Sequence, residues 1–71
     1  MTDTLELKVL IFRKGLSLAK LAKQIGVSIG ALSYKTNGQR PFNQDEILKI
    51  SQILELTPEQ MMKIFFPEVC G

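Results

Sequence analysis

The sequence contains no histidine and only one cysteine, Cys70. This composition argues against transition-metal sites and against several kinds of catalytic site. Transition-metal sites in proteins are built mainly from histidine and cysteine, so the chain has almost nothing from which to build one. Cys–His and Ser–His–Asp nucleophilic sets are excluded, because both need a histidine. We expect no catalytic residue, no metal, no cofactor and no small-molecule substrate. A single cysteine cannot form an internal disulfide, which is typical of a protein from the reducing cytoplasm.

Long apolar runs are missing as well. No stretch approaches the ~18 apolar residues of a membrane span, and the first residues lack the basic and apolar blocks of a secretory signal. We therefore expect no membrane partner. Apolar residues occupy 45% of the 71 positions, which argues against disorder and suffices for one small domain over residues 1–71.

Acidic residues are absent from a long segment of the chain. From Lys8 to Arg40 there are seven basic residues and no acidic one, whereas residues 41–71 have two basic and five acidic residues. The net charge of +2 hides this division. A basic segment of this kind suits a polyanion such as DNA, although a solvated surface with unevenly distributed charge gives the same pattern.

The basic segment contains a pattern typical of a helix–turn–helix, over residues 17–38. Small or apolar residues recur at i, i+3, i+4 and i+7, a spacing that places them on one face of a helix: Leu18, Leu21, Ala22 and Ile25. Ser17 precedes them as an N-cap, and Gly26 follows with the freedom for left-handed φ that often ends a helix. Ser28 then caps a second helix, from Ile29 to about Thr36. In such motifs the second helix enters the major groove of DNA.

The second helix of the motif divides into two faces. Leu32 is its expected core contact, and five residues are expected to point away from the core: Ile29, Gly30, Ser33, Tyr34 and Lys35. Gly30 costs a helix roughly 1 kcal/mol relative to alanine, so its presence indicates close approach to DNA or to the preceding helix. Asn37 and Gly38 end the helix.

Three further helices complete an all-α prediction, because no segment shows a strand pattern. The first covers residues 3–14, with Asp3 as its N-cap and a core-facing stripe of Leu5, Val9 and Phe12.

The other two helices follow the motif, within residues 43–66. One is capped by Asn43 and ends at Leu56. Its expected inner stripe consists of Ile47, Ile50, Ser51 and Leu54. Leu48 and Ile53 are expected to support this stripe. The last is capped by Thr57, begins at Pro58 and is stopped by Pro67.

The stretch LAKLAKQIGVSIGALSYKTNG resembles the helix–turn–helix of the Cro and repressor proteins of phages and prophages. The matching positions are Ala22, Gly26-Val27-Ser28, Leu32-Ser33 and Asn37-Gly38. The stretch RPFNQDEILKISQILELTPEQMMKIFF resembles the continuation in small regulators from phages of Gram-positive bacteria, so the resemblance covers about residues 4–66. It implies a five-helix, lambda-repressor-like DNA-binding domain. Leu18 departs from the family, whose members often have glutamine there.

The resemblance implies that the exposed start of the second motif helix contacts base edges, through Ile29, Gly30, Ser33 and Tyr34. A thymine methyl suits Ile29, and a base edge or phosphate suits the Tyr34 hydroxyl. Both residues also have an ordinary interpretation, as a semi-buried side chain and as a packing aromatic on the surface.

Phosphate contacts are expected from polar residues in and around the motif: Ser28, Lys20, Lys23, Lys35, Asn37, Gln39 and Arg40. Lys35 and Arg40 are the strongest of these candidates. Ser28 is first of all an N-cap, Lys23 suits plain solvation, and the position of Asn37 at a helix end explains it equally well.

A candidate dimer patch is drawn from Met62, Phe65 and Phe66: one helix cannot bury two adjacent phenylalanines against the same core, so one of the two, with Met62, is expected to form the patch. The competing interpretation gives these aromatics to the core. A two-fold dimer would place two recognition helices about one DNA turn apart, roughly 34 Å.

Two functional hypotheses follow from these patterns. The first is a sequence-specific regulator, a Cro-like repressor that binds a pseudo-palindromic operator in double-stranded DNA as a homodimer and is not an enzyme. The second is a helical protein-interaction module, such as an adaptor or an antitoxin-like protein. The acid-free segment from Lys8 to Arg40 favours the first hypothesis.

Overall fold

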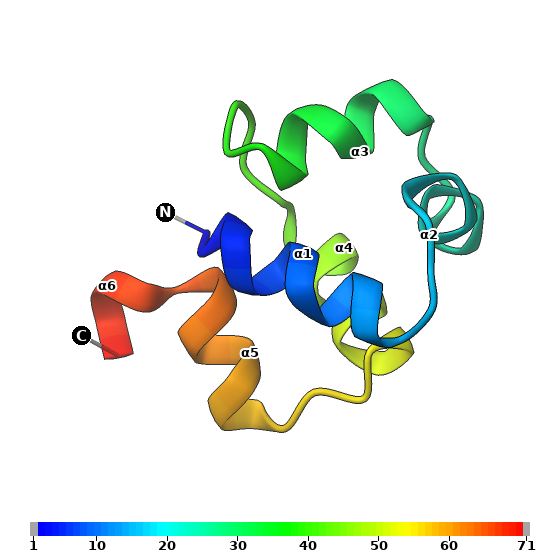
Figure 1. Cartoon of the computed structure of the whole chain (residues 1–71). Helices are drawn as coiled ribbons and strands as arrows, with labels where there is room; N and C mark the ends of the chain where they lie inside the picture. Colours follow the sequence, from blue (N-terminus) through cyan, green and yellow to red (C-terminus); the bar gives the residue numbers. More distant parts are fainter. Residues whose placement is uncertain (1, 71) are drawn as a thin grey trace.

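The computed structural model describes residues 2–70, apart from the side chain of Cys70, so the prediction about that thiol lies outside the description. These residues form six helices: α1 (Thr4–Arg13), α2 (Leu18–Ile25), α3 (Ile29–Thr36), α4 (Gln44–Ile53), α5 (Pro58–Phe65) and α6 (Pro67–Cys70) (Figure 1). Residues 2–70 contain no strand, which confirms the all-α class. The single turn α6 was not predicted. Pro67 ends α5 as expected, but its fixed φ also suits the first position of a new turn.

Local capping chemistry sets where the longer helices begin. At each predicted N-cap a side-chain oxygen accepts the backbone N–H of the residue three positions later, at Asp3, Ser17, Ser28, Asn43 and Thr57. Each such cap typically stabilises a helix by about 1 kcal/mol relative to alanine. The five N-caps predicted from the sequence are therefore confirmed.

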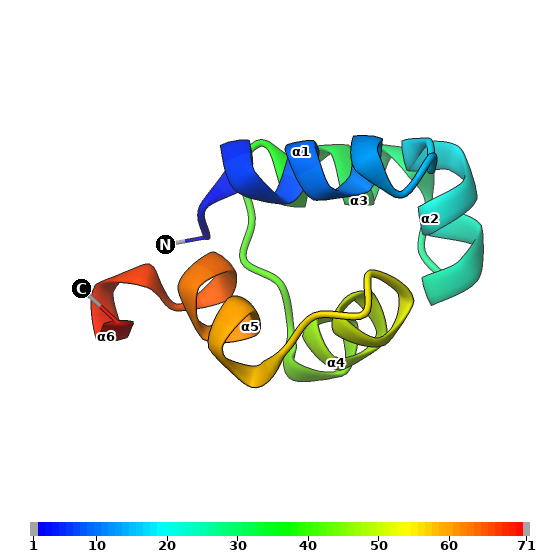
Figure 2. The same ribbon diagram turned by 60° about the horizontal axis from the view of Figure 1, so that its bottom comes forward.

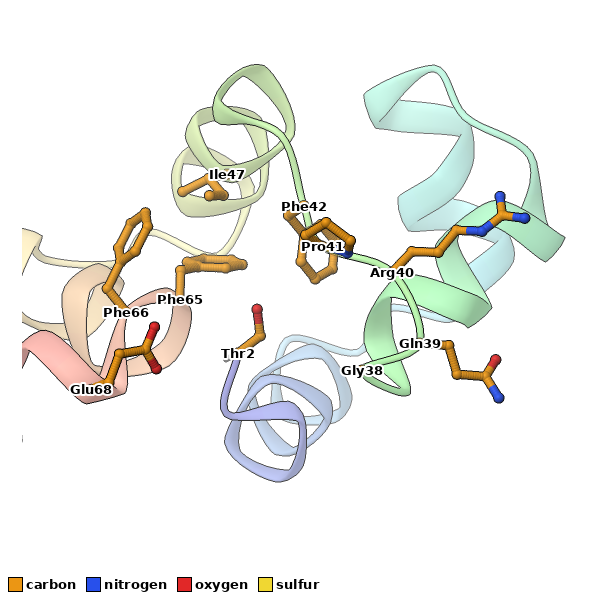
Figure 3. A pocket seen from close by; sticks show the side chains of 10 residues that line it. All are labelled: Thr2, Gly38, Gln39, Arg40, Pro41, Phe42, Ile47, Phe65, Phe66 and Glu68. Carbon is orange, nitrogen blue, oxygen red and sulfur yellow. The ribbon is translucent and has the colours of Figure 1, made fainter.

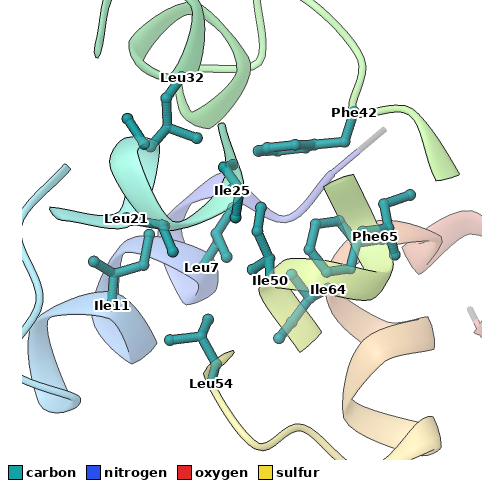
Figure 4. Packing of buried hydrophobic residues seen from close by; sticks show 12 residues of the cluster. Leu7, Ile11, Leu21, Ile25, Leu32, Phe42, Ile50, Leu54, Ile64 and Phe65 are labelled. Atoms are coloured by element: carbon teal, nitrogen blue, oxygen red, sulfur yellow. The ribbon is translucent and has the colours of Figure 1, made fainter. Parts of the chain in front are cut away.

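The helices enclose one apolar core. Figure 2 shows α1 and α3 along one side of the molecule and α4 and α5 along the other. The core between them is made of twelve residues, most of them labelled in Figure 4: Leu7, Ile11, Leu21, Ala22, Ile25, Leu32, Phe42, Ile47, Ile50, Leu54, Ile64 and Phe65. The backbone N–H of Asp3 donates to the carbonyl of Ile64 at 2.6 Å, which fastens the start of α1 to the end of α5.

The predicted inner stripe of α1 is wrong. Leu7 and Ile11 are the buried residues of this helix, whereas Leu5 is 74% exposed and Phe12 is 82% exposed. The helix carries apolar residues on two opposite faces, and both faces show helical spacing. Packing against α3 and α5 selects the face of Leu7, and this choice depends on tertiary contacts that periodicity does not contain.

The inner stripe of α4 is confirmed, since Ile47, Ile50, Ser51 and Leu54 are all buried. Leu48, predicted to support that stripe, is instead 47% exposed. The helix also ends earlier than expected, at Ile53. Glu55 turns the chain with a φ of 55°, and the Leu56 N–H then bonds back to the Ser51 carbonyl at 2.9 Å.

Candidate DNA interface

The turn between α2 and α3 has the geometry predicted for it. Gly26 has a φ of 81°, in the left-handed region that glycine favours, and its N–H donates to the Ala22 carbonyl at 2.9 Å. The N–H of Val27 bonds to the same carbonyl at 3.0 Å. The Ser28 hydroxyl accepts the Ala31 N–H at 3.1 Å and starts α3 at once. In Figure 1, α2 is seen nearly along its axis while α3 lies across the view, so the two helices are strongly inclined.

One face of α3 is fixed in the core. Leu32 is fully buried, as predicted, and so is Thr36, which sequence reasoning missed. The Thr36 hydroxyl donates to the Ser33 carbonyl at 3.1 Å, so its polar atom is satisfied inside the helix. The i, i+4 spacing of Thr36 from Leu32 was the signal that would have placed it on the inner face.

The beginning of α3 faces outward, as predicted. The side chain of Ile29 is 55% exposed, that of Tyr34 is 49% exposed, and Ser33 is half-buried. Gly30 is exposed, and a Cβ added there would meet no heavy atom within 4 Å among the neighbours considered. The predicted close approach of Gly30 to the preceding helix is therefore wrong. The space above this glycine is open to a molecule that approaches from outside.

Lys35 does not point away from the core, and that prediction is wrong. Its side chain is 16% exposed, and its ammonium pairs with the Glu46 carboxylate on α4. The Glu46 side chain is 5% exposed, and its other oxygen accepts the Asn43 N–H at 2.9 Å as part of the capping box. One buried carboxylate thus caps α4 and also holds the C-terminal half of α3. To contact a phosphate, Lys35 would have to leave this pair.

Asn37 connects α3 to α1. Its Oδ1 accepts a hydrogen bond of 2.6 Å from the Lys8 ammonium, and its Nδ2 donates to the Ser33 hydroxyl at 3.4 Å. The amide is exposed, but both of its ends have protein partners. This geometry supports the structural interpretation of Asn37, and it places the Lys8 cation beside the end of α3.

The loop after α3 returns Arg40 toward the outer face of that helix. Gly38 has a φ of 79°, and the Gln39 N–H bonds back to the Tyr34 carbonyl at 2.9 Å. The Arg40 guanidinium carbon lies 4.9 Å from the centroid of the Tyr34 ring, a cation–π contact. Gln39 is exposed on the same loop.

Figure 3 shows how the same loop separates an inner side from an outer side. Phe42 turns inward, where its ring meets that of Phe65 edge-on, with centroids 5.5 Å apart and planes inclined by 83°. Arg40 and Gln39 extend away from this aromatic pair. A surface hollow of about 350 Å³ lies between the loop and the C-terminal helices, and its walls contain these same residues.

Further cations lie on α2 and at the end of α1. Lys20 and Lys23 are exposed on α2, and no acidic side chain of the described part of the chain pairs with either. Lys14 differs, because its ammonium contacts the Glu55 carboxylate at 2.7 Å. The hydrogen bond from Lys14 and its positive charge lower the pKa of Glu55 below 4.5.

The predicted dimer patch is divided by the structure. Phe65 is 4% exposed and packs against Phe42, so it belongs to the core, which corrects the expectation for this residue. Phe66 is 37% exposed and Met62 is half-buried. Phe65 is the last residue of α5 and Phe66 is its non-helical C-cap, so one of these adjacent aromatics lies inside and the other outside.

Two other kinds of feature are absent from the described residues. No group of three or more His, Cys, Asp or Glu side chains among residues 2–70 is arranged to hold a metal ion. None of the helices in this part of the chain combines the length and the apolar character that crossing a membrane requires.

Comparison with known proteins supports this geometry. The chain is similar to a cyanate hydratase from Coprinopsis cinerea, with 35% identity over 51 residues that cover 72% of this chain and 34% of that protein. The chain therefore spans about a third of the length of this curated relative, and the activity in the relative's name is that of the relative. A protein-family model described as helix-turn-helix matches residues 8–61, from the middle of α1 into α5. The chain belongs to this helix-turn-helix family and forms a lambda-repressor-like helical domain.

Proposed function

We propose that the chain is a Cro-like phage or prophage repressor that binds a pseudo-palindromic operator as a dimer and excludes RNA polymerase by occupying its site. The observation that carries this proposal is the exposed beginning of α3, directly after the turn of a family-matched motif. Ile29 and Tyr34 are each about half exposed on the outer face of α3, and a Cβ added at Gly30 would meet no neighbouring heavy atom within 4 Å. A major groove about 12 Å wide accepts a helix presented in this way.

Base contacts in this proposal come from the outer face of α3. The exposed apolar side chain of Ile29 suits a thymine methyl, and the backbone of α3 can approach the base edges closely at Gly30. Tyr34 offers its hydroxyl, because one face of its ring is already covered by Arg40. Ser33 contributes less, since it is half-buried and its hydroxyl already interacts with Asn37.

Phosphate contacts come from the surrounding polar groups, which give affinity and salt dependence rather than sequence choice. Arg40, Lys20 and Lys23 are exposed and have no acidic partner in the described residues. Gln39 and Asn37 lie at the end of α3, and Ser28 lies at its N-terminus, where exposed backbone N–H groups suit an anion. Lys35 is not included, because Glu46 already neutralises its charge.

A fluorescence-anisotropy titration tests the proposed function. DNA that flanks the gene is compared with a scrambled duplex of equal length, at two salt concentrations. We expect a preference for the flanking DNA of about 10³ or more, a ratio typical of specific regulators. Equal and steeply salt-dependent binding to both duplexes would contradict an operator function close to the gene. No binding at low salt would contradict DNA binding and favour a protein partner.

A further inference from the structure

The outer face of α1 is an apolar stripe without a partner in the described chain. Leu5 is 74% exposed and Phe12 is 82% exposed, and Val9, half-buried, lies between them on the same helix face. Phe12 is the most exposed of the large apolar side chains reported for residues 2–70. Burying a phenylalanine normally contributes about 1.5–3 kcal/mol, so a stripe that exposes Leu5 and Phe12 together on one helix face is a surface from which association would gain free energy.

The stripe is self-complementary in an antiparallel arrangement. Consider two copies of α1 related by a two-fold axis that passes beside Val9. Leu5 of each copy then stands opposite Phe12 of the other, and the two copies of Val9 meet at the axis. Along the helix axis, Leu5 and the opposite Phe12 are then offset by only about one residue, or ~1.5 Å of helix rise. Isologous interfaces have this property, because every residue must meet the symmetry mate of another residue on the same patch.

The charges along the stripe follow the same symmetry. Glu6 lies in the first turn of α1 and Arg13 in its last turn. Both lie on one flank of the stripe, because their separation of seven residues is about two helical turns. A two-fold antiparallel pairing brings Glu6 of each copy beside Arg13 of the other, so two opposite-charge pairs flank the apolar contact. Lys8 lies on the opposite flank, where Asn37 already accepts its hydrogen bond.

We propose that the occupant of this stripe is a second copy of the chain, so that α1, and not the end of α5, is the self-association face. The inference rests on the proposed function in one respect, because the proposed repressor binds its operator as a dimer. The alternative patch is weaker, because Phe65 is buried and Phe66 is 37% exposed. One pair of ten-residue helices buries less than the ~1,200 Å² of a stable interface. The free chain therefore associates weakly, and a two-site operator strengthens the pairing by holding two copies close together.

Sedimentation equilibrium of the whole chain without DNA tests the proposal. Across about 10 µM to 1 mM, the range expected for so small an interface, we expect the wild type to move from monomer to dimer. Phe12→Ser should weaken association roughly tenfold or more, since two such side chains are buried per dimer. Phe66→Ser is the matched control and should leave association unchanged. Thermal melting checks folding, which an 82% exposed position should preserve.

A charge exchange makes the test specific for the antiparallel geometry. Glu6→Arg and Arg13→Glu each place like charges side by side across the axis, so each variant alone should associate less than the wild type. An equimolar mixture of the two variants should recover association, because both flanking contacts then join an arginine of one variant to a glutamate of the other. The recovery separates a contact across the axis from a mere loss of helix stability, which mixing would not repair.

Three results would overturn the proposal: a wild-type monomer at about 1 mM, association lost in Phe66→Ser but kept in Phe12→Ser, or no recovery in the mixture. Failure of the DNA-binding proposal is a separate outcome, because sedimentation is measured without DNA. A chain that dimerises through α1 but ignores duplex DNA would contradict the proposed function alone. A Phe12→Ser variant that stays monomeric and still binds a half-operator would support both proposals.

Discussion

The two faces of α3, the proposed recognition helix, have opposite environments. Its inner face is held by the buried side chains of Leu32 and Thr36, and the pair between Lys35 and Glu46 fixes its flank. Its outer face presents Ile29 to the solvent and has open space above Gly30. The contrast indicates that one face of the helix gives stability and orientation while the other remains free for contact. Substitutions on the two faces should therefore separate stability from recognition.

The largest effect is expected on the inner face. Leu32→Ala removes a fully buried side chain and should lower the free energy of unfolding by about 2–5 kcal/mol. A domain of this size has roughly 4–10 kcal/mol in total, so much of its stability would be lost. Urea denaturation followed by circular dichroism measures the change. Ile29→Ala is the control and should change stability by about 0.5 kcal/mol or less. Similar losses in both variants would contradict the comparison.

The ion pair that holds α3 should give the next largest effect. Glu46→Gln retains an oxygen for the Asn43 N–H but removes the charge that faces Lys35, and we expect a loss of about 1–3 kcal/mol in unfolding free energy. The double variant with Lys35→Met should recover part of the loss, because no cation is then left without its partner. A double-mutant cycle measures this coupling, and a coupling energy of zero would show that the pair does not anchor the helix.

On the outer face, Tyr34→Ala should change recognition and spare stability. We expect the preference for operator over scrambled DNA to fall by about 1–3 kcal/mol, the usual value of one specific base contact. Tyr34→Phe keeps the ring beneath Arg40 and removes only the hydroxyl, so it tells which of the two matters. Anisotropy titrations of both duplexes provide the measurement. Unfolding of Tyr34→Ala with unchanged discrimination in Tyr34→Phe would support the packing interpretation instead.

Two cations of the same region should differ in their salt dependence. Arg40→Ala should reduce the slope of log affinity against log salt by about 0.9, the value for one phosphate contact. Lys35→Ala should leave the slope unchanged, because Glu46 already neutralises that ammonium. Titrations with a nonspecific duplex over a range of salt concentrations measure both slopes. A lower slope for Lys35→Ala would mean that Lys35 leaves Glu46 when DNA binds.

The smallest effect concerns an exposed pair, Lys14 with Glu55, which provides a reference for the buried pair on α3. The pKa of Glu55 is lower in the folded chain than its usual 4.5, mainly through the hydrogen bond from Lys14. The pair therefore contributes stability above pH ~4.5, and this contribution is lost as the pH falls through the lowered pKa. Glu55→Gln should make stability slightly less sensitive to acid in this window. Urea denaturation at neutral pH and at a pH below this window would reveal the difference, and an unchanged acid sensitivity would argue against the pair.

Much of this account could be predicted from the sequence wherever the deciding chemistry is local. The N-caps and the turn at Gly26 depend on residues within four positions of each other, so the chain order displays them directly. The inner stripe of α2 has no apolar competitor on its other face and was also predicted correctly.

The errors arose where a partner lies far along the chain. Lys35 looks exposed by helical spacing, and only the fold brings Glu46 beside it, eleven residues away. The face of α1 was reversed because Leu5 and Phe12 follow the same periodicity as the buried Leu7 and Ile11. In α1, apolar residues at helical spacing that are not buried also indicated that the exposed stripe of Leu5 and Phe12 is a contact surface.

The most direct test of the central claim follows backbone amide signals of the whole chain by NMR while duplex DNA from the gene's flank is added. The account predicts that the largest shifts fall on residues 28–34 and on Arg40, while the amides around Leu48 on α4 change little. Shifts concentrated on α4 and α5, with α3 unaffected, would contradict the assignment of the outer face of α3 as the DNA-reading surface.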